Sequence, residues 1–283
     1  MKDVTEQPAG QSRRARVYHN VIIFGAGASY DAGIPLLPAF VDTMWEYAIK
    51  GKVGGKPIPE EHVALLTAAN GIRRDLERYN SRAYFDNYNL EDILSLLSFE
   101  ALGDKQKAEN YNTMVSAVAR TIELSCNLPY IEDAPASPPP LGTPYHRFWL
   151  SLLRKPLSDN LPALITFNYD LVLERALWQC FHRRERGTPK PTVNSCSLKY
   201  AFRDDHFSIK TTRHVYSIRR GPQLSSEEHG EKAVYIPNEN TDADIPYYKL
   251  HGSLNWSRAS HISKPIICGT KAVDEPLILP PCI

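Results

Sequence analysis

Three residues whose side chains could do chemistry stand out in the sequence: Asn168, Asp170 and His251. An amide such as that of Asn168 both donates and accepts hydrogen bonds, so it can hold a water molecule or a sugar hydroxyl. A carboxylate can accept a hydrogen bond from a substrate amide and stabilise a developing positive charge. Histidine has an ordinary pKa of about 6.5, which suits a general base for water or a hydroxyl. These residue types fit the attack of an oxygen nucleophile on a carbon that becomes cationic.

A glycine turn directly after an apolar run is the element expected to hold a ligand. Val21–Phe24 is short and apolar, which predicts a buried parallel strand, and Gly25-Ala26-Gly27-Ala28-Ser29 follows at once. Ser29 is a typical helix cap, so a helix is expected to open there. We predict that this turn binds a diphosphate, with the Ala28 and Ser29 amides pointing into the cleft. Because Tyr30 replaces the usual third glycine, a tight turn that binds nothing stays an alternative.

A second apolar run predicts a second strand that ends beside this turn. Leu161–Thr166 reads as a buried strand, and the segment Phe167–Asp170 leads from it into a helix that reaches about Arg186. Ligands of open α/β sheets bind at the carboxyl ends of the strands, so Thr166, Asn168 and Asp170 are expected to face the same ligand.

Each candidate also has a structural alternative. Asn168 and Asp170 belong to residue types that cap helices, and both precede a predicted helix. A histidine before glycine, such as His251, is often an ordinary turn residue. The remaining histidines have no comparable sequence context and are expected to be structural; they include His146, His182 and His214.

The intervening segments predict an α/β fold with a helical insertion. Residues from Glu60 to Cys126 have a mostly helical pattern and no strand pattern, which predicts a helical lobe within about residues 56–127. After Gly187, short β-like segments are separated by polar turns. We therefore expect a flexible tail over 1–18 and one domain over 19–283. Its predicted class is a doubly wound, Rossmann-like parallel sheet with an inserted helical lobe.

Composition narrows the possible partners. The 283 residues include 33 Lys and Arg against 32 Asp and Glu, a formal net charge of +1, so no overall field favours nucleic acid or a membrane surface. The first residues lack the apolar core of a secretion signal, and no membrane span is predicted. None of the five cysteines lies within four residues of another, so no paired-cysteine metal site is expected. These features favour a cytoplasmic protein.

The sequences of these motifs and their order resemble those of proteins with the sirtuin fold. Gly25-Ala26-Gly27-Ala28-Ser29 with Gly33-Ile34-Pro35, Thr166-Phe167-Asn168-Tyr169-Asp170 and His251-Gly252 match its GAGxS…GIP, TxNxD and HG segments over roughly residues 20 to 256. The chain lacks the paired-cysteine zinc module of the sirtuin deacetylases. Its TFNYD and KLHGSLNW segments resemble instead those of the sirtuin-like NAD-cleaving effectors of bacterial anti-phage defence.

This resemblance implies a function and a set of site residues. It implies hydrolysis of NAD to nicotinamide and ADP-ribose, which depletes cellular NAD during abortive infection, with NAD as substrate and no metal. Asn168, Asp170 and His251 would be catalytic, and the NAD-binding residues would be Gly25, Ala26, Gly27, Ala28, Ser29, Thr166, Asn168 and Asp170. It also implies a homo-oligomer, a cytoplasmic location and a C-terminal sensor domain or separate activating protein.

Three other expectations accompany this one. The apolar end Leu277–Ile283 suggests the N-terminal part of a longer polypeptide. A sirtuin-type protein deacylase or ADP-ribosyltransferase is a second enzymatic possibility. A module that senses NAD or ADP-ribose without turnover is a third possibility, from a different functional class.

Overall fold

The computed structural model describes ten segments of the chain: residues 20–80, 86–128, 143–153, 161–182, 195–200, 206–210, 243–257, 266–267, 271–273 and 276–278. The tail predicted over 1–18 lies outside these residues, and so do two of the β-like segments expected after Gly187, those around His214–Ile218 and Ala233–Ile236. Within the described part, no helix has the length and apolar character needed to span a membrane.

A five-stranded sheet forms the centre of the fold, in the order β1-β4-β7-β5-β6. The first four strands of this order run parallel, and the last pairs antiparallel at the edge. The strands are β1 (Val21–Phe24), β4 (Ala163–Thr166), β7 (Ala243–Lys249), β5 (Ser195–Lys199) and β6 (His206–Lys210). The α/β class and the parallel pairing of the first two predicted strands are thus confirmed, in an arrangement compatible with a Rossmann-like fold.

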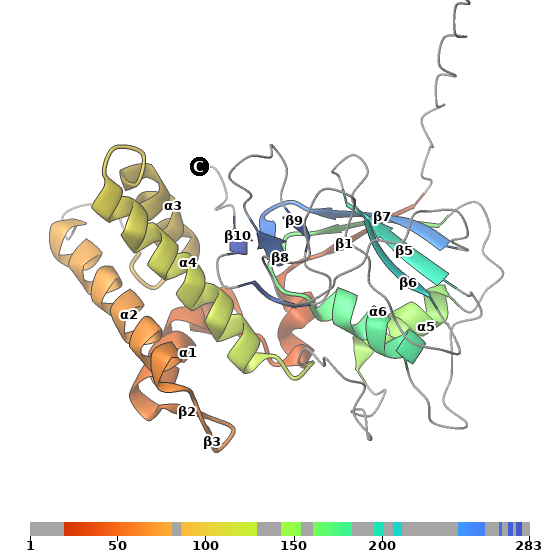
Figure 1. Ribbon diagram of the computed structural model, residues 1–283, viewed down its shortest axis with the longest axis horizontal. Helices are drawn as coiled ribbons and strands as arrows, with labels where there is room; N and C mark the ends of the chain where they lie inside the picture. Colours follow the sequence, from red (N-terminus) through yellow and green to blue (C-terminus); the bar gives the residue numbers. More distant parts are fainter. Residues whose placement is uncertain are drawn as a thin grey trace, which may run out of the picture.

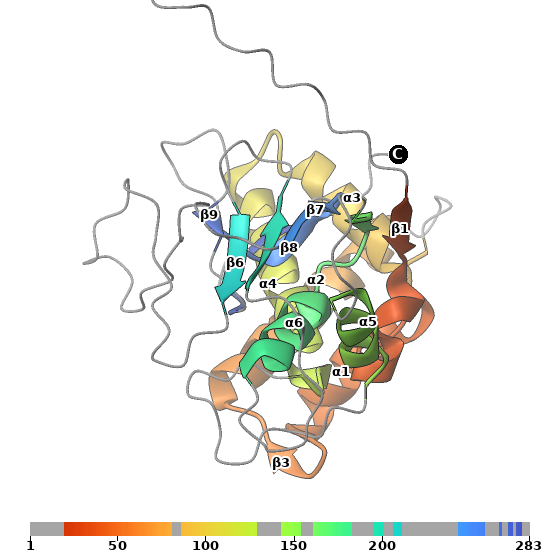
Figure 2. The same ribbon diagram turned by 90° about the vertical axis from the view of Figure 1, so that its right-hand side faces the viewer.

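Two helices lie against one face of this sheet, α5 (Pro144–Leu152) and α6 (Val172–His182), as Figures 1 and 2 show. Phe24 of β1 meets Phe148 of α5 edge to face, with ring centroids 5.3 Å apart. The opposite face of β1 is open, because Val21 and Ile23 are 53% and 63% exposed. The prediction that this strand is buried was therefore wrong. An edge strand with helices on one face exposes every second side chain.

Four helices gather beside the sheet (Figure 1). They are α1 (Leu37–Lys50), α2 (Glu60–Asn80), α3 (Leu90–Glu100) and α4 (Lys105–Ser125), with the short hairpin of β2 (Lys52–Val53) and β3 (Lys56–Pro57) between the first two. Asn89 caps α3 by accepting from the Glu91 amide at 3.0 Å. The helices α2, α3 and α4 fall in the interval that lacked a strand pattern.

The chain returns from these helices to the glycine turn through a close backbone contact. The amide of Asn127 donates to the Ala32 carbonyl at 2.7 Å. Gly33 ends the short helix before it with φ at +88°, and a Cβ there would lie 2.5 Å from the Ser125 carbonyl oxygen. Gly33 is therefore required by both its backbone conformation and this close approach.

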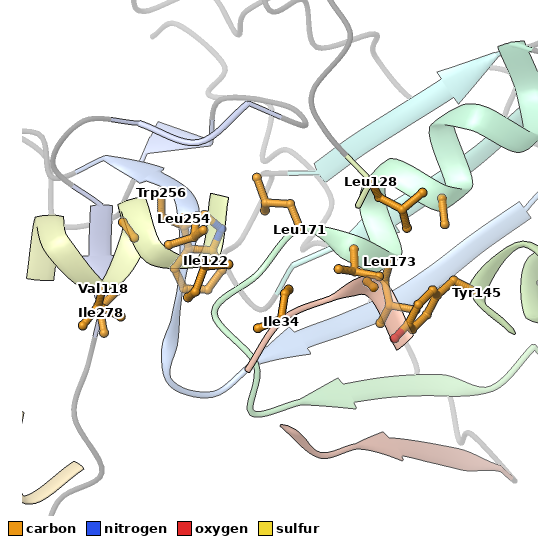
Figure 3. Close-up of a cluster of buried hydrophobic side chains, with 14 of the residues drawn as sticks. Ile34, Val118, Ile122, Leu128, Tyr145, Leu171, Leu173, Leu254, Trp256 and Ile278 are labelled. Carbon is orange, nitrogen blue, oxygen red and sulfur yellow. The ribbon is translucent and has the colours of Figure 1, made fainter. Parts of the chain in front are cut away.

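A small antiparallel sheet follows the central one, in the order β10-β8-β9. Its strands are β8 (Gly252–Ser257), β9 (Ile266–Ile267) and β10 (Pro276–Ile278). Tyr111 of α4 donates its hydroxyl to the Ile278 carbonyl at 3.1 Å, which joins this sheet to the helices. Figure 3 shows the apolar cluster that continues the contact, with Val118 of α4 near Ile278 of β10 and Ile122 of α4 near Leu254 of β8.

Gly252 is the residue that lets β8 and β10 meet. Its φ is +89°, and a Cβ would lie 2.0 Å from the Leu277 carbonyl oxygen. We expect Gly252→Ala to lower the free energy of unfolding by more than about 2 kcal/mol, measured by denaturant unfolding, because strain and a backbone clash act together. Gly55→Ala is the matched control, since Gly55 has φ at +80° and no described atom within 4 Å of a Cβ. Equal losses in the two variants would contradict the close approach.

Candidate functional site

The three predicted motifs meet at the carboxyl ends of β1, β4 and β7. The glycine turn follows β1, the segment Phe167–Asp170 follows β4, and Leu250-His251 follows β7. Backbone hydrogen bonds between neighbouring strands continue past the strand ends. The Phe167 amide donates to the Phe24 carbonyl at 3.3 Å, and the Leu250 amide donates to the Thr166 carbonyl at 3.0 Å. Parallel pairing therefore brings together residues that are far apart in the sequence.

Asn168, Ser29 and Asp170 form a hydrogen-bonded relay across the first two motifs. Nδ2 of Asn168 donates to the Gly25 carbonyl at 3.0 Å and to Oγ of Ser29 at 2.8 Å. Ser29 in turn donates its hydroxyl proton to Oδ2 of Asp170 at 2.6 Å. Ser29 and Asp170 are buried, whereas Asn168 is half-buried and borders the open side of the turn. The relay fixes the glycine turn against the loop after β4.

Ser29 has a different role from the one predicted. Gly25 is the N-cap of a short 3-10 helix over Ala26–Ala32, and Ser29 lies inside that helix rather than at its start. The Ala28 amide donates to the Gly25 carbonyl at 2.9 Å, so it is not a free donor facing a cleft as predicted. The tight i to i+3 hydrogen-bond pattern of a 3-10 helix explains both differences, because it engages an amide that an α-helix would leave unpaired.

Gly25 and Gly27 leave open space above the turn. Gly25 has φ at −93°, and neither residue is among the glycines with positive φ. A Cβ added to either would meet no atom of the described residues within 4 Å. Neither backbone conformation nor internal packing in the described part of the chain requires glycine here. The absent side chains leave room for a ligand to approach the backbone.

Asp170 and Thr166 both stabilise the local backbone. Oδ1 of Asp170 accepts from the Val172 amide at 3.0 Å, which caps α6, while Oδ2 accepts from Ser29. The buried Thr166 hydroxyl accepts from the Asn168 amide at 3.0 Å. The capping alternative is thus confirmed for Asp170, alongside its bond to Ser29. Asn168 instead directs its side chain to the glycine turn.

His251 lies between β7 and β8 with its ring among aromatic neighbours. Its ring centroid lies 5.4 Å from that of Phe167, edge to face, and 6.2 Å from that of Tyr169. The side chain is half-buried, and among the described residues no hydrogen-bond partner of its ring nitrogens is found. His251 therefore contacts the two aromatic residues that flank Asn168 in the sequence and is not bonded to the relay. His146, in contrast, is buried and bonded through both ring nitrogens, to Thr143 and Gln179, as expected of a structural histidine.

Three further residues support the site and were not predicted from the sequence. Lys249 is buried, and its Nζ donates to the Asp170 carbonyl and, at 3.1 Å, to Oε1 of the buried Glu174. Tyr145 donates its hydroxyl to the Ala28 carbonyl. Side chains alternate along a strand, so Lys249 lies on the same face of β7 as Tyr247. This alternation was the one sequence signal that Lys249 is buried. Nothing in the local pattern indicated the partners of these residues.

Burial raises the pKa of two tyrosines of this region. Desolvation, followed by the nearby carboxylate of Asp170, raises the pKa of Tyr145 well above its ordinary value. Desolvation and then Glu91 raise the pKa of Tyr169 in the same way. Both phenols therefore remain hydrogen-bond donors at neutral pH. Tyr145 keeps its bond to the turn over the physiological range.

Comparison with known proteins adds no family assignment. No protein-family model matches the chain, and no curated protein has significant similarity to it. Among the residues that the structure describes, no group of three or more His, Cys, Asp or Glu side chains could hold a metal ion.

Proposed function

We propose that the chain is an NAD glycohydrolase that cleaves NAD to nicotinamide and ADP-ribose in a doubly wound, sirtuin-type domain. The observation that carries this proposal is the relay of Asn168, Ser29 and Asp170 at the open glycine turn, with His251 in ring contact with Phe167, the residue before Asn168. The motif resemblance supports the identity of the substrate. In the absence of any family match, the geometry and these motifs are its support.

Cleavage of the nicotinamide–ribose bond requires little proton transfer to the leaving group. Nicotinamide departs as a neutral molecule, and the ribose carbon passes through an oxocarbenium-like state. The protein must then hold NAD, orient its carboxamide and supply a nucleophile. In this proposal Oδ1 of Asn168 holds the attacking water or the ribose, because Nδ2 is already bonded to the turn. His251 accepts the proton of the nucleophile.

Asp170 has a dual role in the proposal. Its two carboxylate oxygens already accept from Ser29 and Val172, so it holds the relay in place. Each carboxylate oxygen has a second lone pair, which leaves capacity to accept from the carboxamide. Its negative charge also favours the developing cation. The diphosphate would lie against Gly25–Ser29, where the two glycines leave space.

One assay separates this function from its two alternatives. The protein is incubated with NAD, and free nicotinamide and ADP-ribose are quantified by chromatography, with and without an acetylated peptide. A glycohydrolase releases nicotinamide without peptide. Release that depends on the peptide would indicate a deacylase, transfer of ADP-ribose to a protein would indicate a transferase, and NAD binding without products would indicate a sensing module.

The predicted position of the diphosphate can be tested at Gly27. We expect Gly27→Val to weaken NAD binding at least about tenfold by calorimetry, because a branched side chain fills the space that the ligand needs. The melting temperature should change little more than in Gly71→Val, the control, since neither glycine has a described atom within 4 Å of a Cβ. Unchanged NAD affinity in Gly27→Val would show that the diphosphate binds elsewhere.

A cellular role follows from the proposed reaction. An NAD glycohydrolase of this kind, acting in the cytoplasm as a homo-oligomer, would deplete NAD once a sensor region or an activating protein reports phage infection. Cellular NAD measured during infection, in cells with the wild-type gene and with a His251→Ala gene, tests this role. Equal NAD levels in the two cultures would contradict it.

A further inference from the structure

Lys249 and Glu174 form an ion pair inside the molecule, directly behind the candidate site. Nζ of Lys249 lies 3.1 Å from Oε1 of Glu174, and both side chains are 0% exposed. Oε1 also accepts from the Tyr200 hydroxyl at 3.4 Å, whereas Oε2 has no hydrogen-bond partner among the described residues. A pair that is fully desolvated and incompletely bonded adds little to folding stability, because desolvation offsets the attraction. Stability therefore does not explain why these charges are buried.

The position of Lys249 offers an explanation. Its ammonium also donates to the main-chain carbonyl of Asp170, 79 residues away in sequence. Lys249 is the last residue of β7, pairs in register with Thr166 of β4 and stands two residues before His251. One ammonium thus joins the strand that leads to His251 to the loop that holds the Asn168–Ser29–Asp170 relay.

We infer that Lys249 is a positioning residue that sets the place of His251 relative to this relay, with Glu174 as its counter-charge. The inference rests on the proposed cleavage of NAD. A carbonyl and a carboxylate hold Nζ from two elements, so the end of β7 cannot slide along the loop after β4 without breaking a buried bond. A shift of about 1 Å in a catalytic group can cost about 10²-fold in rate.

A neutral pair of substitutions separates positioning from folding. Lys249→Met alone leaves the Glu174 charge buried without a cation and should lower the melting temperature by on the order of 10 °C. Adding Glu174→Gln removes that charge and should restore most of the loss. The double variant still lacks the bond to the Asp170 carbonyl, so its kcat should remain about 10–100-fold below wild type. Its KM for NAD should stay within about threefold, because the glycine turn is untouched.

A second ion pair on the same helix provides the control. Arg175 of α6 bonds Glu123 of α4 at 2.8 Å, with side chains 2% and 19% exposed, and also donates to the Leu128 carbonyl at 3.1 Å. The double variant Arg175→Met with Glu123→Gln should keep the wild-type kcat below its unfolding transition. The ring carbon–proton NMR signals of His251, assigned by their loss in His251→Ala, should shift in the Lys249/Glu174 double variant and not in this control.

The outcomes distinguish this inference from the proposed reaction. A stable Lys249/Glu174 double variant with wild-type kcat and an unchanged His251 signal would overturn the inference. If the wild-type protein released no nicotinamide while the His251 signal shifted only in that variant, the reaction would be wrong and the positioning of His251 would be supported. Loss of kcat in both double variants would overturn the role of Lys249, since any buried pair would then have the same effect.

Discussion

Replacing His251 by alanine is expected to lower the rate of NAD cleavage by about 10²–10⁴, equivalent to roughly 3–5 kcal/mol of transition-state stabilisation. His251 follows the carboxyl end of β7, and its ring makes an edge-to-face contact with that of Phe167. The side chain is half-buried. Among the candidates, its ring is the group best suited to remove a proton from the nucleophile. The measurement is kcat from nicotinamide release at saturating NAD, in an assembly whose wild-type form is demonstrably active.

Measurements of folding and of NAD binding separate a catalytic role of His251 from a structural one. The side chain of His251 contributes ring contacts but no hydrogen bond found among the described residues, so His251→Ala should unfold within a few degrees of wild type. NAD affinity should stay within about threefold, because the turn at Gly25–Ser29 is unchanged. A general base that is missing from a half-open site can be replaced from solution, so added imidazole should restore part of the rate. Wild-type kcat in the variant would remove His251 from the mechanism.

Several features of this site followed directly from local sequence patterns. Val21–Phe24 and Leu161–Thr166 were predicted to be strands of one parallel sheet, and the structure pairs them in parallel from Val21 opposite Ala163 to Phe24 opposite Thr166. Short apolar runs followed by polar turns and helices identify such units, because the pattern is local. Gly33 ends the short helix before it, and its positive φ explains why glycine is required.

Other features depend on contacts that local patterns do not encode. Val21 and Ile23 are exposed because β1 lies at the sheet edge, and strand order cannot be read from the strand itself. The hydrogen bond from Ser29 to Asp170 joins residues 141 positions apart in the sequence. It places Ser29 in the relay, whereas the sequence had suggested a helix cap. The pairing of Lys249 with Glu174 spans 75 residues between a strand and a helix. Only the tertiary fold selects such partners.

Replacing Asn168 by alanine is expected to lower kcat by about 10²–10³ while NAD affinity falls less than about tenfold. The variant loses two hydrogen bonds, to the Gly25 carbonyl and to Oγ of Ser29, and it removes the oxygen proposed to hold the nucleophile. Binding should persist because the two glycines, which leave space for the diphosphate, are unchanged. The measurements are kcat from nicotinamide release and the Kd for NAD by calorimetry.

A double-mutant cycle with Ser29 tests whether the relay acts as one unit. Ser29→Ala removes one of the two acceptors of Asn168 and the donor to Asp170, so it should loosen the Asn168 side chain, which keeps only its bond to the Gly25 carbonyl among those of the relay. The losses in kcat from Ser29→Ala and Asn168→Ala should therefore be non-additive. The kcat of the double variant should be close to that of the less active single variant. Thr43→Ala is the control, because the Thr43 hydroxyl donates to the Ala39 carbonyl within α1 and has no bond to the relay among the described residues, so its effect should add independently. Additive losses for Asn168 and Ser29 would mean that the two side chains act separately, and the relay would then not act as one unit.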